Sequence, residues 1–144
     1  MEKSINMLNE QFRELFELKK PDARAYSPLT LAYLGDAVYE IIVRSIIVGQ
    51  SNAPVQKLHK RSSDLVKASA QADIIKIIES MLDEEEEAVY KRGRNAKSYT
   101  VAKNASMTDY RMATGFEALM GYLFLQGRME RILELVHAGI KEKI

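Results

Sequence analysis

Apolar residues recur at spacings of three and four along most of the chain, and no segment shows sustained two-residue alternation between turn signals. A spacing of three or four places side chains on one face of a helix, whereas strict alternation is typical of a strand. The sequence therefore predicts an all-α fold. A chain of 144 residues can bury one core without disulfides. Because no internal repeat or linker divides it, we expect a single domain over residues 1–144.

The bounds of the expected helices follow from residues that favour helix ends. Ser27 followed by Pro28 is typical of a helix start, and this helix should run to about Val48, where Gly49 would end it. A first helix is expected over 4–19, a third from Pro54 through Val66, and further helical segments over 72–81 and from Asp83 to Gly93. Thr108 should cap a long apolar helix that runs through Leu125, and a final amphipathic helix should follow Gly127.

Charged residues are segregated along the chain, although the formal net charge is only +1. Five consecutive acids beginning at Asp83 precede a basic stretch without acids. This order suits a helix macrodipole, with Asp83 and Glu86 forming a capping box and Gly93 ending the helix. The macrodipole does not account for Arg94 and Lys97, which would then lie in a loop where a phosphate-contacting segment would be useful. The pattern favours RNA contact but leaves a plain charged helix open.

Several classes of protein are not expected. The chain has no cysteine, so it has neither disulfides nor thiolate metal sites and fits a reducing, cytoplasmic compartment. No apolar run approaches the roughly 18 residues of a membrane span, and no export signal is visible. His59 and His137 belong to no recognised metal-ligand spacing, and neither a nucleophile elbow nor a glycine-rich phosphate loop is present.

Two carboxylates stand inside apolar helical segments, Asp36 and Glu117. Burying an unpaired carboxylate costs several kcal/mol, so such a group pairs with a cation, a metal ion or a hydrogen-bonding partner. For Asp36, a bond to a tyrosine hydroxyl or a backbone amide is the alternative to a metal. Gly35 and Gly121, each within one turn of an acid, predict two helices that cross closely with oxygen ligands facing one another. Oxygen ligands favour magnesium or manganese over zinc.

Glu40 lies one helical turn beyond Asp36 on the same stripe of the expected helix. Two like charges at this spacing repel, so a cation near both would be stabilising. Arg44, one turn further along, could instead pair with Glu40. The residues leave both arrangements open.

Two ordered segments resemble the ribonuclease III family: Leu-Gly-Asp-Ala-Val at 34–38 and Phe-Glu-Ala-Leu at 116–119. More narrowly, Gly-Asp-Ala at 35–37 with Glu40, the basic run at 91–98, and 116–119 with the apolar 121–125 are similar to the mini-ribonuclease III group. The resemblance implies an all-helical, homodimeric endonuclease domain that uses magnesium, with manganese able to substitute. It also implies cleavage of double-stranded RNA to 5′-phosphate and 3′-hydroxyl ends, with the large-subunit (23S) ribosomal RNA precursor as substrate and a ribosomal protein as a candidate partner.

Carried over by position, Asp36 and Glu117 are the expected catalytic and metal-binding residues. Full-length members have acids where this chain has Ala32 and Thr114. This difference leaves the number of metal ions open. It also keeps open the alternative of a non-catalytic relative that binds structured RNA. We expect Glu40 and Thr114 to lie behind the ligands. The expected RNA contacts are Arg92, Arg94, Asn95, Lys97 and Ser98.

Overall fold

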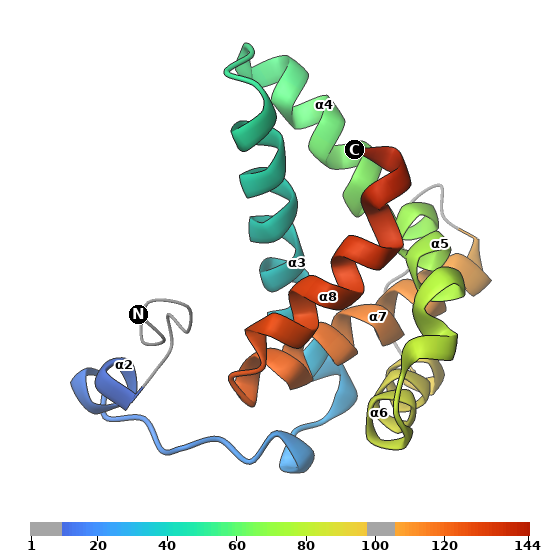
Figure 1. Ribbon diagram of the computed structural model, residues 1–144. Helices are drawn as coiled ribbons and strands as arrows, with labels where there is room; N and C mark the ends of the chain where they lie inside the picture. The colour runs from blue at the N-terminus through green and yellow to red at the C-terminus, as the bar shows by residue number, and fades with distance from the viewer. Residues whose placement is uncertain (1–9, 98–105) are drawn as a thin grey trace.

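The computed structural model describes residues 10–97 and 106–144, and within them the chain forms helices and no strands (Figure 1). The all-α prediction is therefore confirmed. Ser98 and the expected helical residues 4–9 lie outside the described residues. The helices are α2 (Glu10–Leu15), α3 (Pro28–Gln50), α4 (Val55–Val66), α5 (Ala68–Ile78), α6 (Glu84–Asn95), α7 (Met107–Leu125) and α8 (Met129–Ile140), with short 3-10 turns at Ala23–Ala25, Glu79–Met81 and Lys141–Lys143.

Helix α7 forms the centre of the fold and packs against α3, α5, α6 and α8. Its side chains are buried on nearly every side, including Phe116, Leu119 and Tyr122, each with no exposed surface. A helix that is apolar all round is stable only when other elements surround it. None of the described helices is both long enough and apolar enough to cross a membrane.

The backbones of α3 and α7 touch where they cross. A Cβ atom added to Gly35 would overlap the carbonyl oxygen of Glu117 and would lie 2.8 Å from the backbone nitrogen of Gly121. A Cβ atom on Gly121 would in turn overlap the carbonyl oxygen of Leu31. The close crossing predicted from the two glycines is confirmed, and it places Glu117 beside the turn of α3 that precedes Asp36.

Two predicted helix starts are confirmed by their hydrogen bonds. The hydroxyl oxygen of Ser27 accepts a bond from the backbone N–H of Thr30 at 3.3 Å, with Pro28 as the first helical residue. Asp83 and Glu86 form the predicted capping box, with distances of 2.8 Å and 3.0 Å. These short-range motifs act within one turn, so the local sequence is sufficient to specify them.

Two glycines were wrongly predicted to end helices. Helix α3 continues past Gly49 to Gln50, and α6 continues past Gly93 to Asn95. Gly93 is buried against α7, where an added Cβ atom would lie only 2.8 Å from the side chain of Ala118. Its role is close helix packing and not termination.

Other predicted helix ends also shift. The N-cap of α7 is Ser106, whose hydroxyl accepts a bond from Asp109 at 3.0 Å, and Thr108 lies inside the helix. Helix α2 ends at Leu15 and not at Lys19, because Glu17 adopts a positive φ of 55°. Figure 1 shows α2 standing away from the other helices, and none of its residues is buried.

A buried ion pair joins α8 to the start of α6. The Glu86 carboxylate has no exposed surface and accepts two hydrogen bonds of 2.8 Å from the guanidinium of Arg131. These bonds outweigh burial and lower the pKa of Glu86. The same carboxylate also completes the capping box, so one side chain stabilises a helix start and an interhelical contact.

Candidate active site

The α3–α7 crossing brings Asp36 and Glu117 together, as the sequence predicted. The negative charge of Asp36 acts on Glu117, and the two carboxyl groups share a hydrogen bond. The prediction that both acids are buried is wrong for Asp36, which is exposed, whereas Glu117 is partly buried. Gly35 faces α7, and the following residue is rotated about 100° around the helix, which turns Asp36 toward solvent.

The electrostatics of this pair favour a cation. Burial, followed by the negative charge of Asp36, raises the pKa of Glu117 to about 8, although a hydrogen bond from Gln71 acts in the opposite direction. Two adjacent carboxylates resist simultaneous ionisation unless a positive charge lies between or beside them. A divalent cation would relieve this repulsion and keep both groups ionised.

The donor set fits a hard divalent cation that retains water ligands. Within residues 10–97 and 106–144, no group of three or more histidine, aspartate or glutamate side chains could hold a metal ion. Magnesium is commonly bound by one or two carboxylates, with water and substrate oxygens completing its coordination. Asp36 and Glu117 would supply the two carboxylates, one accessible to solvent and one fixed in the wall of the site.

Glu40 and Thr114 have other partners. The Glu40 carboxylate forms a 2.7 Å ion pair with Arg44, which is the second of the two arrangements that the sequence left open. Thr114 is buried, and its hydroxyl donates a 3.0 Å hydrogen bond to the carbonyl of Tyr110 within α7. Their expected place behind the metal ligands stays a prediction.

Gln71 is a residue of this site that the sequence analysis missed. It lies on α5 with 3% of its surface exposed, and its Nε2 donates to Glu117 Oε2 at 3.2 Å. The same nitrogen donates to the carbonyl of Val66 at 2.7 Å. The sequence carries no distinctive signal for Gln71, because Asp73 is a second polar residue in the same stretch.

The described members of the predicted RNA contacts lie at or just beyond the C-terminal end of α6. Arg92, Asn95 and Lys97 are exposed, while Arg94 is half-buried with its guanidinium 5.7 Å from the centre of the Tyr90 ring. The Nε of Arg94 also donates to Asn95 Oδ1 at 3.2 Å. Arg94 therefore belongs to the last helical turn and not to a loop as predicted, whereas Lys97 lies beyond the helix end, as predicted.

The backbone of this basic helix end packs against the turn of α7 that carries Glu117. Gly93 packs against Gly115 and Ala118, and Glu117 lies between these two positions in the sequence of α7. Arg92 and Arg94 adjoin Gly93, so their backbone positions are fixed by the packing of Gly93 against this turn of α7. Such a placement suits contact with a polyanion whose reacting phosphate lies at the carboxylates.

Comparison with known proteins gives consistent matches. The model of the family described as Ribonuclease III domain matches residues 29–128. The chain is 52% identical over 121 residues to Mini-ribonuclease 3 of Clostridium tetani, covering 83% of this chain and 80% of that protein. It is 49% identical to Mini-ribonuclease 3 of Enterococcus faecalis, covering 84% and 93%. A crystal structure of a protein from Fusobacterium nucleatum matches with a TM-score of 0.78 and 34% identity, covering 85% of this chain and 98% of that one.

Proposed function

The chain belongs to the ribonuclease III family, and on that premise we propose that it is a magnesium-dependent endoribonuclease that cleaves double-stranded RNA. The observation that carries the proposal is the meeting of Asp36 and Glu117 at the glycine crossing of α3 and α7. The products would carry 5′-phosphate and 3′-hydroxyl ends, and manganese would substitute for magnesium. Family membership supports a divalent metal ion, and the two carboxylates are the groups suited to bind it.

The two carboxylates have different tasks in this mechanism. When bound, magnesium makes water a better nucleophile and stabilises the charge that develops on the phosphoryl oxygens. Asp36, which is exposed, lies on the side that the RNA approaches. Glu117, held by Gln71, gives the site a fixed wall. No side chain of the protein has to act as a nucleophile.

RNA binding is assigned to the basic end of α6. We propose that Arg92, Arg94, Asn95, Lys97 and Ser98 contact phosphates and 2′-hydroxyl groups. An A-form duplex presents these groups across its shallow minor groove, where proteins recognise shape more than sequence. The proximity of Gly93 to the turn of α7 that carries Glu117 supports this assignment.

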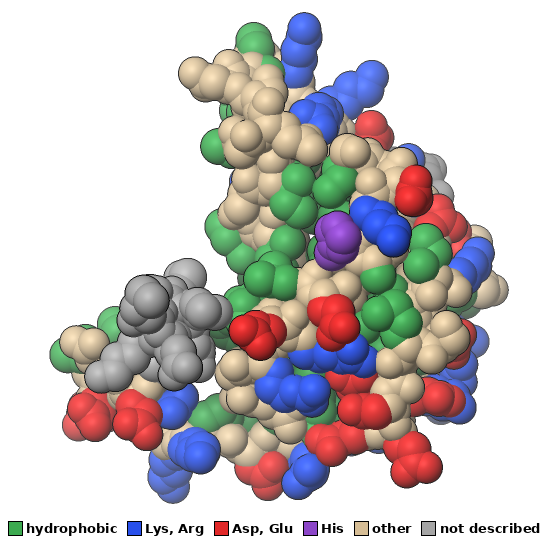
Figure 2. Space-filling model, viewed as in Figure 1, with side chains coloured by type: hydrophobic (Ala, Val, Ile, Leu, Met, Phe, Trp, Pro, Cys, Tyr) green, Lys and Arg blue, Asp and Glu red, His purple; other side chains and the backbone are tan. Residues whose placement is uncertain are grey.

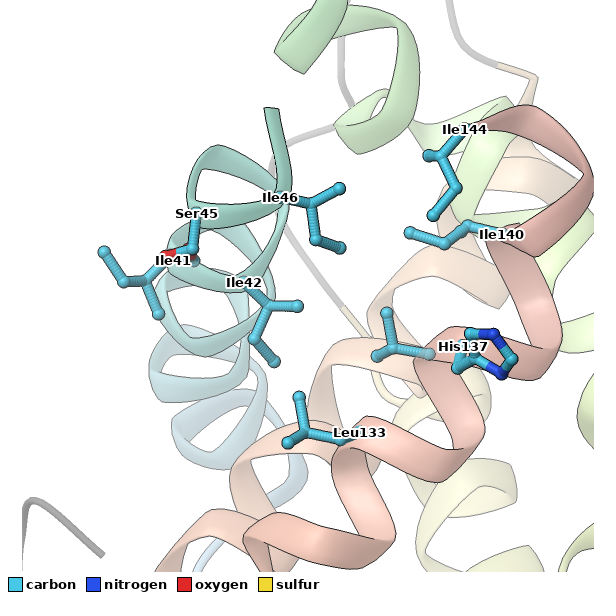
Figure 3. A pocket seen from close by; sticks show the side chains of 9 residues that line it. Ile41, Ile42, Ser45, Ile46, Leu133, His137, Ile140 and Ile144 are labelled. Atoms are coloured by element: carbon cyan, nitrogen blue, oxygen red, sulfur yellow. The ribbon is translucent and has the colours of Figure 1, made fainter. Parts of the chain in front are cut away.

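A second copy of the chain is proposed to cover an apolar face of α3. Tyr33, Ile41 and Val48 on this helix are 85%, 60% and 62% exposed. Figure 2 shows hydrophobic side chains over α3 and α8 on the viewed face. Ile41 also borders a groove of about 450 Å³ between these helices, across which Ile42 and Ile46 of α3 face Leu133 and Ile140 of α8 (Figure 3). A homodimer would offer two catalytic sites to opposite strands of one duplex.

The dimer can be tested with one charged substitution. Ile41→Lys should shift the sedimentation coefficient from that of a dimer to that of a monomer, because a charge in an apolar interface is costly. Ile77→Lys on α5 is the matched control, since Ile77 is also half exposed but lies outside this face. Equal dimerisation in both variants would reject the proposed face.

The natural substrate is proposed from family resemblance. We propose that the enzyme matures the 5′ and 3′ ends of the large-subunit (23S) ribosomal RNA precursor in the cytoplasm, with a ribosomal protein presenting the RNA. A comparison of precursor cleavage in the presence and absence of ribosomal proteins tests this part separately from the chemistry.

The decisive experiment is cleavage of a long RNA duplex with and without magnesium. The parent is compared with Asp36→Asn and Glu117→Gln, with single-stranded RNA and duplex DNA as control substrates. Magnesium-dependent cleavage of duplex RNA alone, lost in both variants while RNA binding persists, is the expected result. If the parent binds but does not cleave both the RNA duplex and the ribosomal precursor, the result would favour a non-catalytic RNA-binding relative. The observation behind this alternative is that Ala32 and Thr114 stand where full-length members have acids.

A further inference from the structure

Gln71 is a buried polar residue on α5 whose side chain reaches the candidate catalytic pair on α7. Its position is not explained by the chemistry assigned to Asp36 and Glu117. Resting on the proposed function, we propose that Gln71 is a positioning residue for the cation site and holds the Glu117 carboxylate in one orientation. This role follows from the hydrogen-bonding capacity of each atom of its amide.

The orientation of the amide is set by Val66. A backbone carbonyl can only accept a hydrogen bond, so the atom that faces Val66 at 2.7 Å must be the NH₂ group. The other hydrogen of that group is then available to Glu117 Oε2, 3.2 Å from Nε2. The Val66 carbonyl, at the C-terminal end of α4, therefore fixes the position of the NH₂ group that Gln71 presents to Glu117.

The other end of the amide shows that this arrangement is not optimised for stability. Gln71 Oε1 is buried and has no hydrogen-bond partner among the described residues. A buried acceptor without a partner destabilises a fold, and an apolar residue of similar length would avoid that penalty. A purely structural role for Gln71 does not account for this acceptor, whereas a donor bond to a cation-binding carboxylate gives the amide a function.

A fixed carboxylate matters more in this protein than in a site with many ligands. Within the described part of the chain the site offers two carboxylates, Asp36 and Glu117, and no third metal-binding side chain groups with them. Loss of a fixed orientation at one of them therefore weakens a large part of the protein's contribution to cation binding. Groups that hydrogen-bond to metal ligands typically change metal affinity by about 10- to 100-fold when they are removed. We expect an effect in this range for Gln71.

The test compares Gln71→Met with the parent and with Gln126→Met. Methionine keeps the length of glutamine and removes the donor, and Gln126 is a matched control because its Nε2 also approaches a glutamate, Glu85, at 3.4 Å, but at an exposed position. Mn²⁺ affinity is measured by isothermal titration calorimetry, and duplex cleavage is measured across a range of Mg²⁺ concentrations.

Gln71→Met should remain folded without metal and should bind Mn²⁺ about 10-fold or more weakly. The Mg²⁺ concentration for half-maximal cleavage should rise by a similar factor, while the rate at saturating Mg²⁺ changes much less. Gln126→Met should behave like the parent. If Gln71 only packs α5, the substitution should lower the melting temperature and should leave the Mg²⁺ concentration for half-maximal cleavage unchanged.

A second measurement needs no substitution and covers the case in which Gln71→Met does not fold. The side-chain amide signals of Gln71 are followed by NMR while Mg²⁺ is added to the unaltered protein. They should shift as the acceptor carboxylate takes up the cation, whereas the amide signals of Gln126 should stay in place. Unchanged Gln71 signals at saturating Mg²⁺ would overturn the inference.

The outcomes separate this inference from the proposed function. Equal Mn²⁺ affinity in the parent and in Gln71→Met overturns the role of Gln71 and leaves the endoribonuclease intact. If the parent neither binds Mn²⁺ nor cleaves RNA, the proposed function fails, and the positioning role fails with it.

Discussion

Gly35→Ala is expected to reduce both stability and catalysis, because the added methyl group would meet the backbone of α7. The Cβ atom would lie 2.7 Å from the carbonyl carbon of Glu117, whereas ordinary contact begins at 3.4 Å. Relieving this one contact requires a separation of about 0.7 Å, and the overlap with the carbonyl oxygen requires more. A gap of that order forfeits roughly a quarter to a half of the dispersion energy between the separated atoms.

The magnitude follows from two opposing effects. Overpacking a core costs about 1–3 kcal/mol, and the upper end applies here because backbone atoms cannot rotate away. Alanine recovers about 1 kcal/mol through its higher helix propensity. The net loss in the free energy of unfolding should be about 2 kcal/mol, and the melting temperature should fall by about 4–8 °C. Cleavage should also weaken, because separating the helices moves Asp36 away from Glu117.

Urea denaturation followed by circular dichroism measures the stability, and duplex cleavage measures the site. Gly49→Ala is the matched control, since Gly49 lies in the same helix with nothing within 4 Å of an added Cβ atom. It should be neutral or should stabilise by a few tenths of a kcal/mol. If Gly35→Ala proves as stable as Gly49→Ala, the backbone contact between α3 and α7 does not exist as described.

Three further variants test other parts of the fold and the site. Arg94→Ala should weaken duplex RNA binding and reduce its dependence on salt concentration without loss of helicity, and an unchanged salt slope would reject the phosphate contact. Glu86→Gln should destabilise at neutral pH by about 3 kcal/mol, because Arg131 is left without its buried partner. Since the folded pKa of Glu86 lies below the unfolded value of about 4.3, this difference should shrink as the pH falls through the folded pKa. Equal differences in urea denaturation at pH 7 and pH 3 would contradict the ion pair. Tyr39→Phe should cost about 1–3 kcal/mol in thermal denaturation, because it leaves the buried carbonyl of Leu65 without its 2.7 Å hydrogen bond; a neutral effect would show that this carbonyl finds another donor.

Glycine shows where prediction from sequence succeeds and where it fails. Gly35 and Gly121 were correctly interpreted as points of close helix approach, since each lies in mid-helix beside an acid. Gly93 was interpreted as a helix end and is in fact a packing position against Ala118. The absence of a Cβ atom serves both roles, and near the end of an expected helix the local sequence does not distinguish them.

The candidate site was only partly predictable. Asp36 and Glu117 were identified because an acid in an apolar helical segment is a local anomaly. Gln71 was missed because its importance depends on the position of α5 relative to α7, and glutamine is unremarkable in a helix. The exposure of Asp36 depends in the same way on which side of α3 is covered.

The amino-acid sequence by itself determined the helical architecture, the caps at Ser27 and Asp83, and the two glycines that allow α3 and α7 to touch. The helical pattern, the caps and the position of each glycine beside its acid depend on residues within one or two turns of each other, so the local sequence is sufficient to indicate them. The tertiary structure alone decided that Asp36 faces solvent and that Gln71 reaches Glu117. Burial and hydrogen bonding between distant segments depend on how whole helices pack against one another. That packing results from many side chains together and is not visible in any one short stretch of sequence.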